Sequence, residues 1–120
     1  MATNGGDAQL IENLRGEIVR AGLSEPRSSF YWIKGFTLAA MQAAGYWLLT
    51  HHSAGPRAAG VVVSALAMVQ FGILAHDAGH GSISRTRWVN AFWGYLAMSL
   101  VCGMGFSRWR AAHHLHHLTD

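Results

Sequence analysis

The sequence predicts an all-α membrane protein, in which a transmembrane helical hairpin is followed by interfacial helices that carry two histidine boxes. Three observations support this prediction. Hydrophobic residues make up 51% of the 120 residues and charged residues only 12%, against about 25% charged residues in an ordinary soluble domain. Two long stretches carry almost no charge. Six of the eight histidines fall in two five-residue windows.

The composition excludes several classes of protein. A single cysteine, Cys102, rules out an internal disulfide framework and a four-cysteine zinc module. The net charge is +3, but it rests on only nine Lys and Arg residues, which are too few for a nucleic-acid surface. We therefore expect no nucleic-acid partner.

Residues 1–29 form the polar part of the chain and are predicted to contain a short amphipathic helix. Apolar residues recur there at steps of three and four, a spacing typical of a helix with one apolar face; they are Leu10, Ile11, Leu14, Ile18 and Ala21. We expect this helix to lie on the membrane surface ahead of the first span.

Two membrane spans are predicted, over residues 30–50 and 58–75. The first contains one charge, Lys34, and at 1.5 Å per residue it would be about 31 Å long, enough to cross the hydrocarbon of a bilayer. The second is uncharged, and a polar turn that includes His51 and His52 separates the two. The pair is predicted to form a transmembrane hairpin.

The basic residues predict the orientation of this hairpin. Eight of the nine Lys and Arg residues lie before the first span, near its start (Lys34) or after the second span, and Arg57 lies in the turn. Because Lys and Arg are retained on the cytoplasmic side, both ends of the hairpin are expected there.

A third apolar stretch, residues 88–106, leaves two topologies open. A plain third span would place the histidines before and after it on opposite faces of the membrane. An interfacial or re-entrant segment would keep both groups on the same face. Arginines on both sides of the stretch favour the interfacial or re-entrant path.

The first histidine box follows the second span directly and reads HDAGH, from His76 to His80. If the helix continues for one more turn, His76 and His80 share a face, and Gly81 can end the helix in a left-handed cap. Asp77 is a candidate to orient a liganding imidazole, or else is a surface carboxylate.

The second box reads HHLHH, and on a helix His113, His116 and His117 converge on one side. His114 points elsewhere, so it is either an outer contact or solvated. Imidazoles gathered in this way suit a transition metal, and iron, copper and zinc all remain open.

The runs HDAGHGSISRTRWVN and WRAAHHLHHLT, with 32 residues between His80 and His113, resemble the HxxxH and HxxHH boxes of the membrane fatty acid desaturase family. The resemblance covers about residues 30–120 and implies a partial desaturase domain in an integral, multi-pass membrane enzyme. It further implies a non-haem di-iron centre on the cytoplasmic side, with His76, His80, His113, His116 and His117 as iron ligands and no other catalytic residue.

The same resemblance implies that the enzyme uses O2 and electrons from ferredoxin or cytochrome b5 to introduce a double bond into an acyl chain, carried on a lipid or on CoA. The family's third histidine box is missing from this sequence, so we expect an amino-terminal portion of a longer enzyme. Two alternatives remain at this point: a hydroxylase or ketolase of the same superfamily, and a non-catalytic membrane protein that binds metal.

Overall fold

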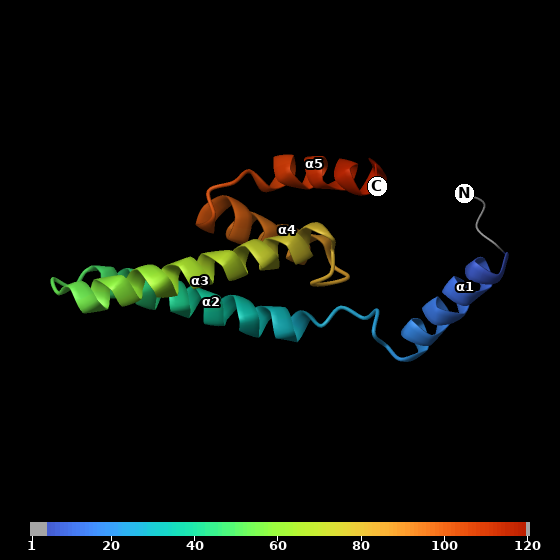
Figure 1. Ribbon diagram of the computed structural model, residues 1–120, viewed down its shortest axis with the longest axis horizontal. Helices are drawn as coiled ribbons and strands as arrows, with labels where there is room; N and C mark the ends of the chain where they lie inside the picture. The colour runs from blue at the N-terminus through green and yellow to red at the C-terminus, as the bar shows by residue number, and fades with distance from the viewer. Residues whose placement is uncertain (1–4, 120) are drawn as a thin grey trace.

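The computed structural model describes the backbone of residues 5–119 and the side chains of residues 6–116 (Figure 1). The described chain is built from helices and turns and contains no strand, as the sequence predicts. Its elements are α1 (Gly5–Arg20), α2 (Ser28–Leu49), α3 (Ala54–Gly79), α4 (Arg87–Gly94), the π-helix η1 (Tyr95–Val101) and α5 (Phe106–Thr119).

Helices α2 and α3 lie side by side and antiparallel, joined by a short turn (Figure 1). Their buried residues recur at steps of three and four, which gives each helix one stripe that faces its partner. The stripe of α2 includes Leu38 and Gln42, and that of α3 includes Ser64, Ala67 and Phe71. Helices α2 and α3 thus form an antiparallel pair, and a transmembrane hairpin stays a prediction.

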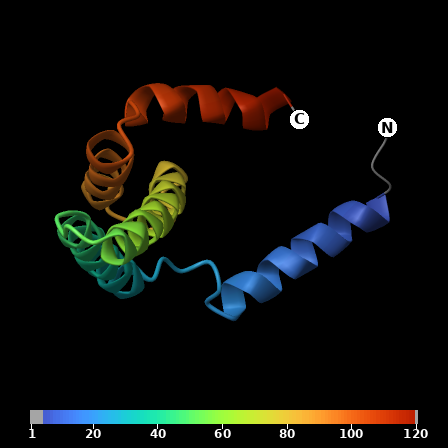
Figure 2. The same ribbon diagram turned by 60° about the vertical axis from the view of Figure 1, so that its left-hand side comes forward.

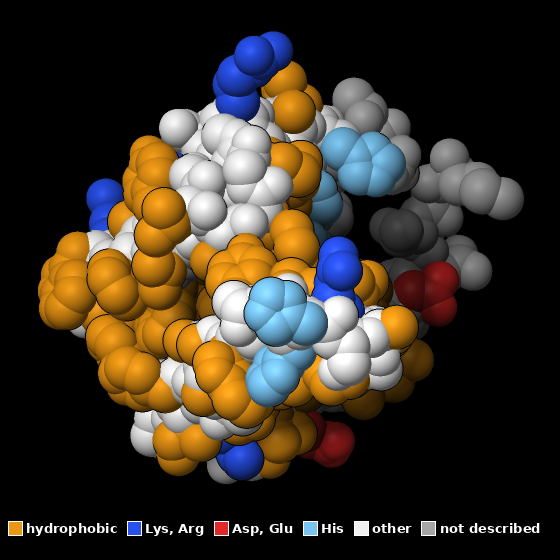
Figure 3. Space-filling model, turned by 90° about the vertical axis from the view of Figure 1, so that its left-hand side faces the viewer, with side chains coloured by type: hydrophobic (Ala, Val, Ile, Leu, Met, Phe, Trp, Pro, Cys, Tyr) orange, Lys and Arg blue, Asp and Glu red, His pale blue; other side chains and the backbone are white. Residues whose placement is uncertain are grey.

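The outer faces of this hairpin are apolar and exposed. Ile33 is 69% exposed on α2, and Val69 is 63% exposed on α3. Hydrophobic side chains also cover much of the end view in Figure 3, which looks onto the turn between α2 and α3. Extended apolar surfaces of this kind are typical of contact with lipid or with further protein.

Within the described residues, α3 is the one single helix that is both long and apolar enough to cross a membrane. It has 26 residues and so extends beyond the predicted span 58–75 at both ends. Lys34, Thr37 and Gln42 lower the hydropathy of α2, and a second span through α2 stays a prediction.

The third apolar stretch runs back along α3 and then reverses. Helix α4 and η1 form one helical stretch that packs against α3, and at 1.5 Å per residue it extends at most about 22 Å, less than the ~30 Å of a bilayer's hydrocarbon. A bend of 110° then leads into α5. Helix α5 then runs back toward the C-terminal end of α3 (Figures 1 and 2). A bent pair of this kind fits either a broken span or a re-entrant loop, so the choice between the two topologies stays a prediction.

The core lies where α2, α3 and the α4–η1 stretch meet. Leu74 and Ala75 of α3 are fully buried, as is Ala97 of η1. Trp93 of α4 is 2% exposed and packs edge-to-face on Trp32 of α2.

Helix α1 forms where the amphipathic pattern predicts a helix. It projects away from the bundle (Figure 2), and its apolar residues Leu10, Ile11 and Ile18 are about half exposed or more. A location on the membrane surface stays a prediction for this helix.

Candidate metal centre

The first histidine box occupies the last turn of α3. His76 and His80 are four residues apart, and their rings face each other with centroids 4.6 Å apart. The His80 amide donates a hydrogen bond to the His76 carbonyl (3.1 Å), and Gly81 then adopts a φ of +72°. A backbone conformation with positive φ favours glycine, because glycine has no Cβ that would clash there. The predicted shared face and glycine cap are both confirmed.

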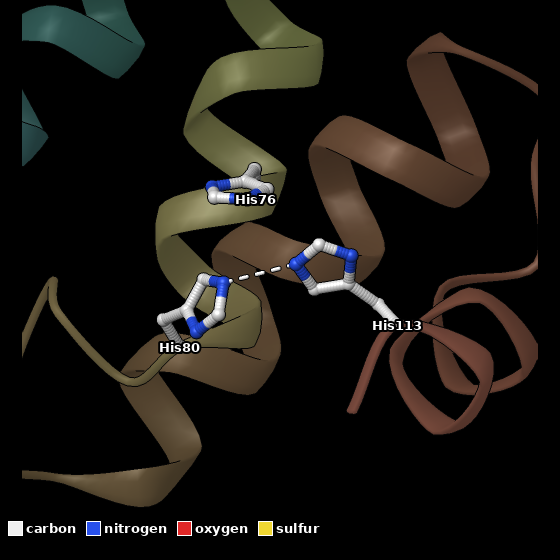
Figure 4. A group of neighbouring side chains, drawn as sticks. All are labelled: His76, His80 and His113. Atoms are coloured by element: carbon white, nitrogen blue, oxygen red, sulfur yellow. Dashed lines mark hydrogen bonds between the residues drawn. The ribbon is translucent and has the colours of Figure 1, made fainter. Parts of the chain in front are cut away.

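The second box reaches this site from α5. His113 lies opposite the first box, and its Nε2 is 3.0 Å from Nε2 of His80 (Figure 4). The rings of His76 and His113 have centroids 5.0 Å apart. One ring nitrogen from each of these three residues lies within 4.8 Å of the other two. The two boxes, 33 positions apart at their closest pair, therefore meet at one end of the bundle.

The spacing of one pair of these nitrogens fits two neighbouring positions around a transition metal. Imidazole nitrogens bind such ions at about 2.0–2.1 Å, so two nitrogens in neighbouring coordination positions lie roughly 3.0–3.4 Å apart. The 3.0 Å between the Nε2 atoms of His80 and His113 matches this spacing. His76 retains 47% of its side-chain exposure, so the site is open on one side. Three imidazoles at an open site can hold one ion and leave positions for other ligands.

The other predicted ligands of the second box lie outside this group of three. His116 is exposed, and its ring centroid is 6.4 Å from that of His113. The side chain of His117 lies outside the described residues. His114 places its Nε2 3.4 Å from the Gly79 carbonyl, and its ring is stacked on that of His80 with centroids 6.2 Å apart. These contacts favour an outer contact of His114 with the first box over a fully solvated side chain.

Asp77 lies beside the histidines and is linked to α2. Its Oδ1 is 3.7 Å from Nδ1 of His76, which is beyond hydrogen-bond distance. Its Oδ2 accepts a hydrogen bond of 3.2 Å from the hydroxyl of Tyr31. Sequence reasoning did not find Tyr31, because an aromatic residue near the start of a span is typical of any interfacial belt.

The loop that follows the first box, residues 81–86, is held by contacts with α4 and with the segment at the start of α2. Asn90 of α4 accepts hydrogen bonds from the amides of Ile83 and Ser84. Ser28, at the start of α2, donates a 2.9 Å hydrogen bond to the Ile83 carbonyl, and Arg85 pairs with Glu25. These contacts hold the residues that follow His80 in place.

An open cavity of about 700 Å³ lies between this loop and the segment that connects α1 to α2. His80 forms part of its wall, so the cavity adjoins the three histidines. The other lining residues are Leu23, Ser24, Glu25, Pro26, Arg27, Phe30, Tyr31, Gly81 and Ser82.

The sequence matches known proteins over most of its length. Residues 53–120, which contain both histidine boxes, match the family described as Fatty acid desaturase. The chain is 27% identical over 103 residues to an acyl-lipid (8-3)-desaturase of Thraustochytrium sp. (86% of this chain, 24% of the relative). It is 30% identical over 108 residues to an acyl-lipid (9-3)-desaturase of Physcomitrium patens (89% and 21%).

A further relative is the sn-1 oleoyl-lipid 12-desaturase of Anabaena variabilis, 29% identical over 86 residues (72% of this chain, 24% of the relative). The chain thus spans about a quarter of the length of these curated relatives or less. No solved structure matches the chain significantly.

Proposed function

The chain belongs to the fatty acid desaturase family, and from this premise we propose that it supplies part of the metal centre of an oxygen-dependent desaturase, an oxidoreductase that introduces a double bond into an acyl chain. One observation carries the proposal: His76, His80 and His113 come from two separate boxes and place their ring nitrogens within 4.8 Å of one another. The three similar proteins described above are all named as lipid desaturases.

The proposed metal is iron, as a non-haem pair. When bound, the iron pair supplies the activation of O2 that removal of hydrogen from an unactivated acyl chain requires. His76, His80 and His113 would bind the metal. Asp77 accepts a hydrogen bond from Tyr31 and would lie beside the metal site as a carboxylate, 3.7 Å from Nδ1 of His76. Further ligands are proposed to come from His116 and His117 and from another part of a longer polypeptide or a second chain.

The proposed location is a membrane, with the histidines at its cytoplasmic face. The apolar length of α3 supports a crossing there, and α2 is proposed to cross beside it. The excess of basic residues at the histidine end, eight against one in the turn, supports a cytoplasmic location for that end. From the cytoplasm, ferredoxin or cytochrome b5 would deliver electrons. We propose an acyl-lipid as substrate in preference to acyl-CoA, because the three similar proteins described above are named as desaturases of acyl-lipids.

Iron binding by the 120-residue chain tests the proposal. The chain is purified in detergent micelles without oxygen, loaded with Fe²⁺, and its bound iron is measured against protein. Replacing His80 or His113 by Ala removes a ligand, so each variant should bind iron at least about tenfold more weakly, since even outer-shell changes cost 10–100-fold. His52→Ala is the matched control, because His52 lies in the turn at the opposite end of the hairpin.

Equal iron binding by the wild type, H80A and H113A would contradict the assignment of these ligands. Binding of zinc with no binding of iron would support a non-catalytic metal-binding protein instead.

A further inference from the structure

Trp109 of α5 lies against the last turn of α3, where the first histidine box is located. Its indole covers Gly79, and a Cβ at position 79 would lie 2.7 Å from Cζ3 of Trp109. Real Cβ atoms do not approach a ring so closely, so the indole reaches this position only because residue 79 has no side chain. Trp109 is partly buried and packs against the main core.

The same indole stacks on a candidate ligand. The rings of Trp109 and His113 have centroids 4.7 Å apart and an interplanar angle of 14°. His76 meets the indole at 5.8 Å and 61°. One side chain thus contacts one imidazole from each histidine box and also the backbone of α3.

This stack determines how His113 can point. When the face of the His113 imidazole is stacked on the indole, only the edge of the imidazole is left to face other groups. Both of its nitrogens lie on that edge. With the face of His113 against the indole, its Nε2 lies 3.0 Å from Nε2 of His80 (Figure 4). If the stack were absent, the χ1 and χ2 angles of an imidazole on an open surface would sample other orientations.

We propose that Trp109 is a positioning residue for the metal centre. It packs on Gly79 and stacks on His113, and these two contacts fix how His113 of the second histidine box is placed relative to His76 and His80 of the first. The inference rests on the proposed metal binding by His76, His80 and His113. It adds a residue outside both boxes and a steric partner, Gly79, inside the first.

The test is a titration of the full chain in detergent micelles with Co²⁺, whose visible absorption reports the geometry of its ligands. Trp109→Ala should weaken Co²⁺ binding roughly 10- to 100-fold, the range found when groups that orient metal ligands are removed, and should alter the absorption band. Trp109→Phe keeps a ring on His113 and should recover most of the affinity. Trp88→Ala is the matched control, because Trp88 is 65% exposed and lies outside the site.

A second pair of variants tests the steric contact directly. Gly79→Ala pushes the indole off α3 and should weaken Co²⁺ binding, although His76 and His80 are intact. Adding Trp109→Phe removes the outer ring atoms that the new methyl group meets, so the double variant G79A/W109F should bind Co²⁺ more tightly than G79A alone.

The outcomes separate the two proposals. Wild-type affinity and an unchanged spectrum in W109A would overturn the role of Trp109 and leave the ligands standing. An equal or weaker affinity in G79A/W109F than in G79A would overturn the steric part of the inference. Failure of the wild-type chain to bind Co²⁺ any better than the H80A variant would overturn the metal centre itself. Circular dichroism checks that each variant keeps its helices.

Discussion

At the scale of single residues, Asn90 does the most to organise the segment that follows the first histidine box. It is 9% exposed, and its Oδ1 accepts hydrogen bonds from the amides of Ile83 and Ser84, both at 3.2 Å. Its Nδ2 donates to the carbonyls of Ser84 (2.6 Å) and Thr86 (3.2 Å). One buried amide therefore pairs with four backbone groups of this loop, of which the Thr86 carbonyl also accepts hydrogen bonds from the amides of Val89 and Asn90.

Removing this amide should destabilise the fold. Asn90→Ala leaves the two amides and the two carbonyls without this partner, and each buried group left unpaired costs about 1–3 kcal/mol. Because water can reach part of the loop, we expect a total loss of about 2–3 kcal/mol in the free energy of unfolding, measured by SDS titration in mixed micelles. Ser84→Ala is the control, since it removes a single exposed hydrogen bond to the Thr86 amide. Equal effects of the two substitutions would show that Asn90 has no special role.

At the scale of secondary-structure elements, the reversal between η1 and α5 decides where the second box lies. The chain turns at Cys102–Gly105, and Gly103 has a φ of +70°. Ser99 Oγ in η1 accepts a 3.2 Å hydrogen bond from the amide of Phe106, which begins α5. The side chain of Phe106 is 1% exposed. The start of α5 is thus anchored to η1, and the bend is not a flexible connection.

Substituting the left-handed residue of this turn should destabilise the reversal. Gly103→Ala places a Cβ in a conformation that costs L-residues roughly 1–2 kcal/mol, which we expect to appear as an equal fall in the free energy of unfolding in the same SDS titration. Gly105→Ala is the control: its φ is not positive, and a Cβ there would come no nearer than 3.9 Å to Arg108. Matching losses for the two variants would argue that backbone strain at Gly103 is unimportant.

At the scale of the whole molecule, the path of the chain brings both histidine boxes to one end. The α2–α3 hairpin carries the first box at the far end from its turn, and the α4–η1 stretch returns along α3 before α5 reverses again (Figures 1 and 2). In a membrane this arrangement requires residues 82 and 111 on one face and residue 53 on the other.

Labelling with a maleimide that cannot cross membranes checks this topology. In a Cys102→Ser background, which removes the single native cysteine, the exposed residues Ser53, Ser82 and Ala111 are replaced by cysteine one at a time. In intact cells Ser53→Cys should react, whereas Ser82→Cys and Ala111→Cys should react only after permeabilisation, because the excess of Lys and Arg at that end predicts a cytoplasmic location. Reaction of Ser82→Cys and Ala111→Cys from opposite sides would contradict a shared metal site.

Local sequence patterns determined much of this architecture. The long, nearly uncharged runs of α2 and α3, the spacing of the apolar residues in α1, the four-residue spacing of His76 and His80, and the glycine that follows them are short-range features of the sequence. They were sufficient to predict two long apolar helices, the helix α1 and the shared face of the first box.

Only the tertiary structure decided which imidazoles meet. On an isolated helix His113, His116 and His117 share one side equally well, and nothing in their spacing tells which of them faces α3. The rotation of α5 about its axis depends on contacts with residues distant in sequence, above all Trp109 on Gly79 and Phe106 against η1. The same holds for Tyr31, which reaches Asp77 across 46 positions. Such contacts arise from the packing of elements against one another, and periodicity within one element carries no information about them.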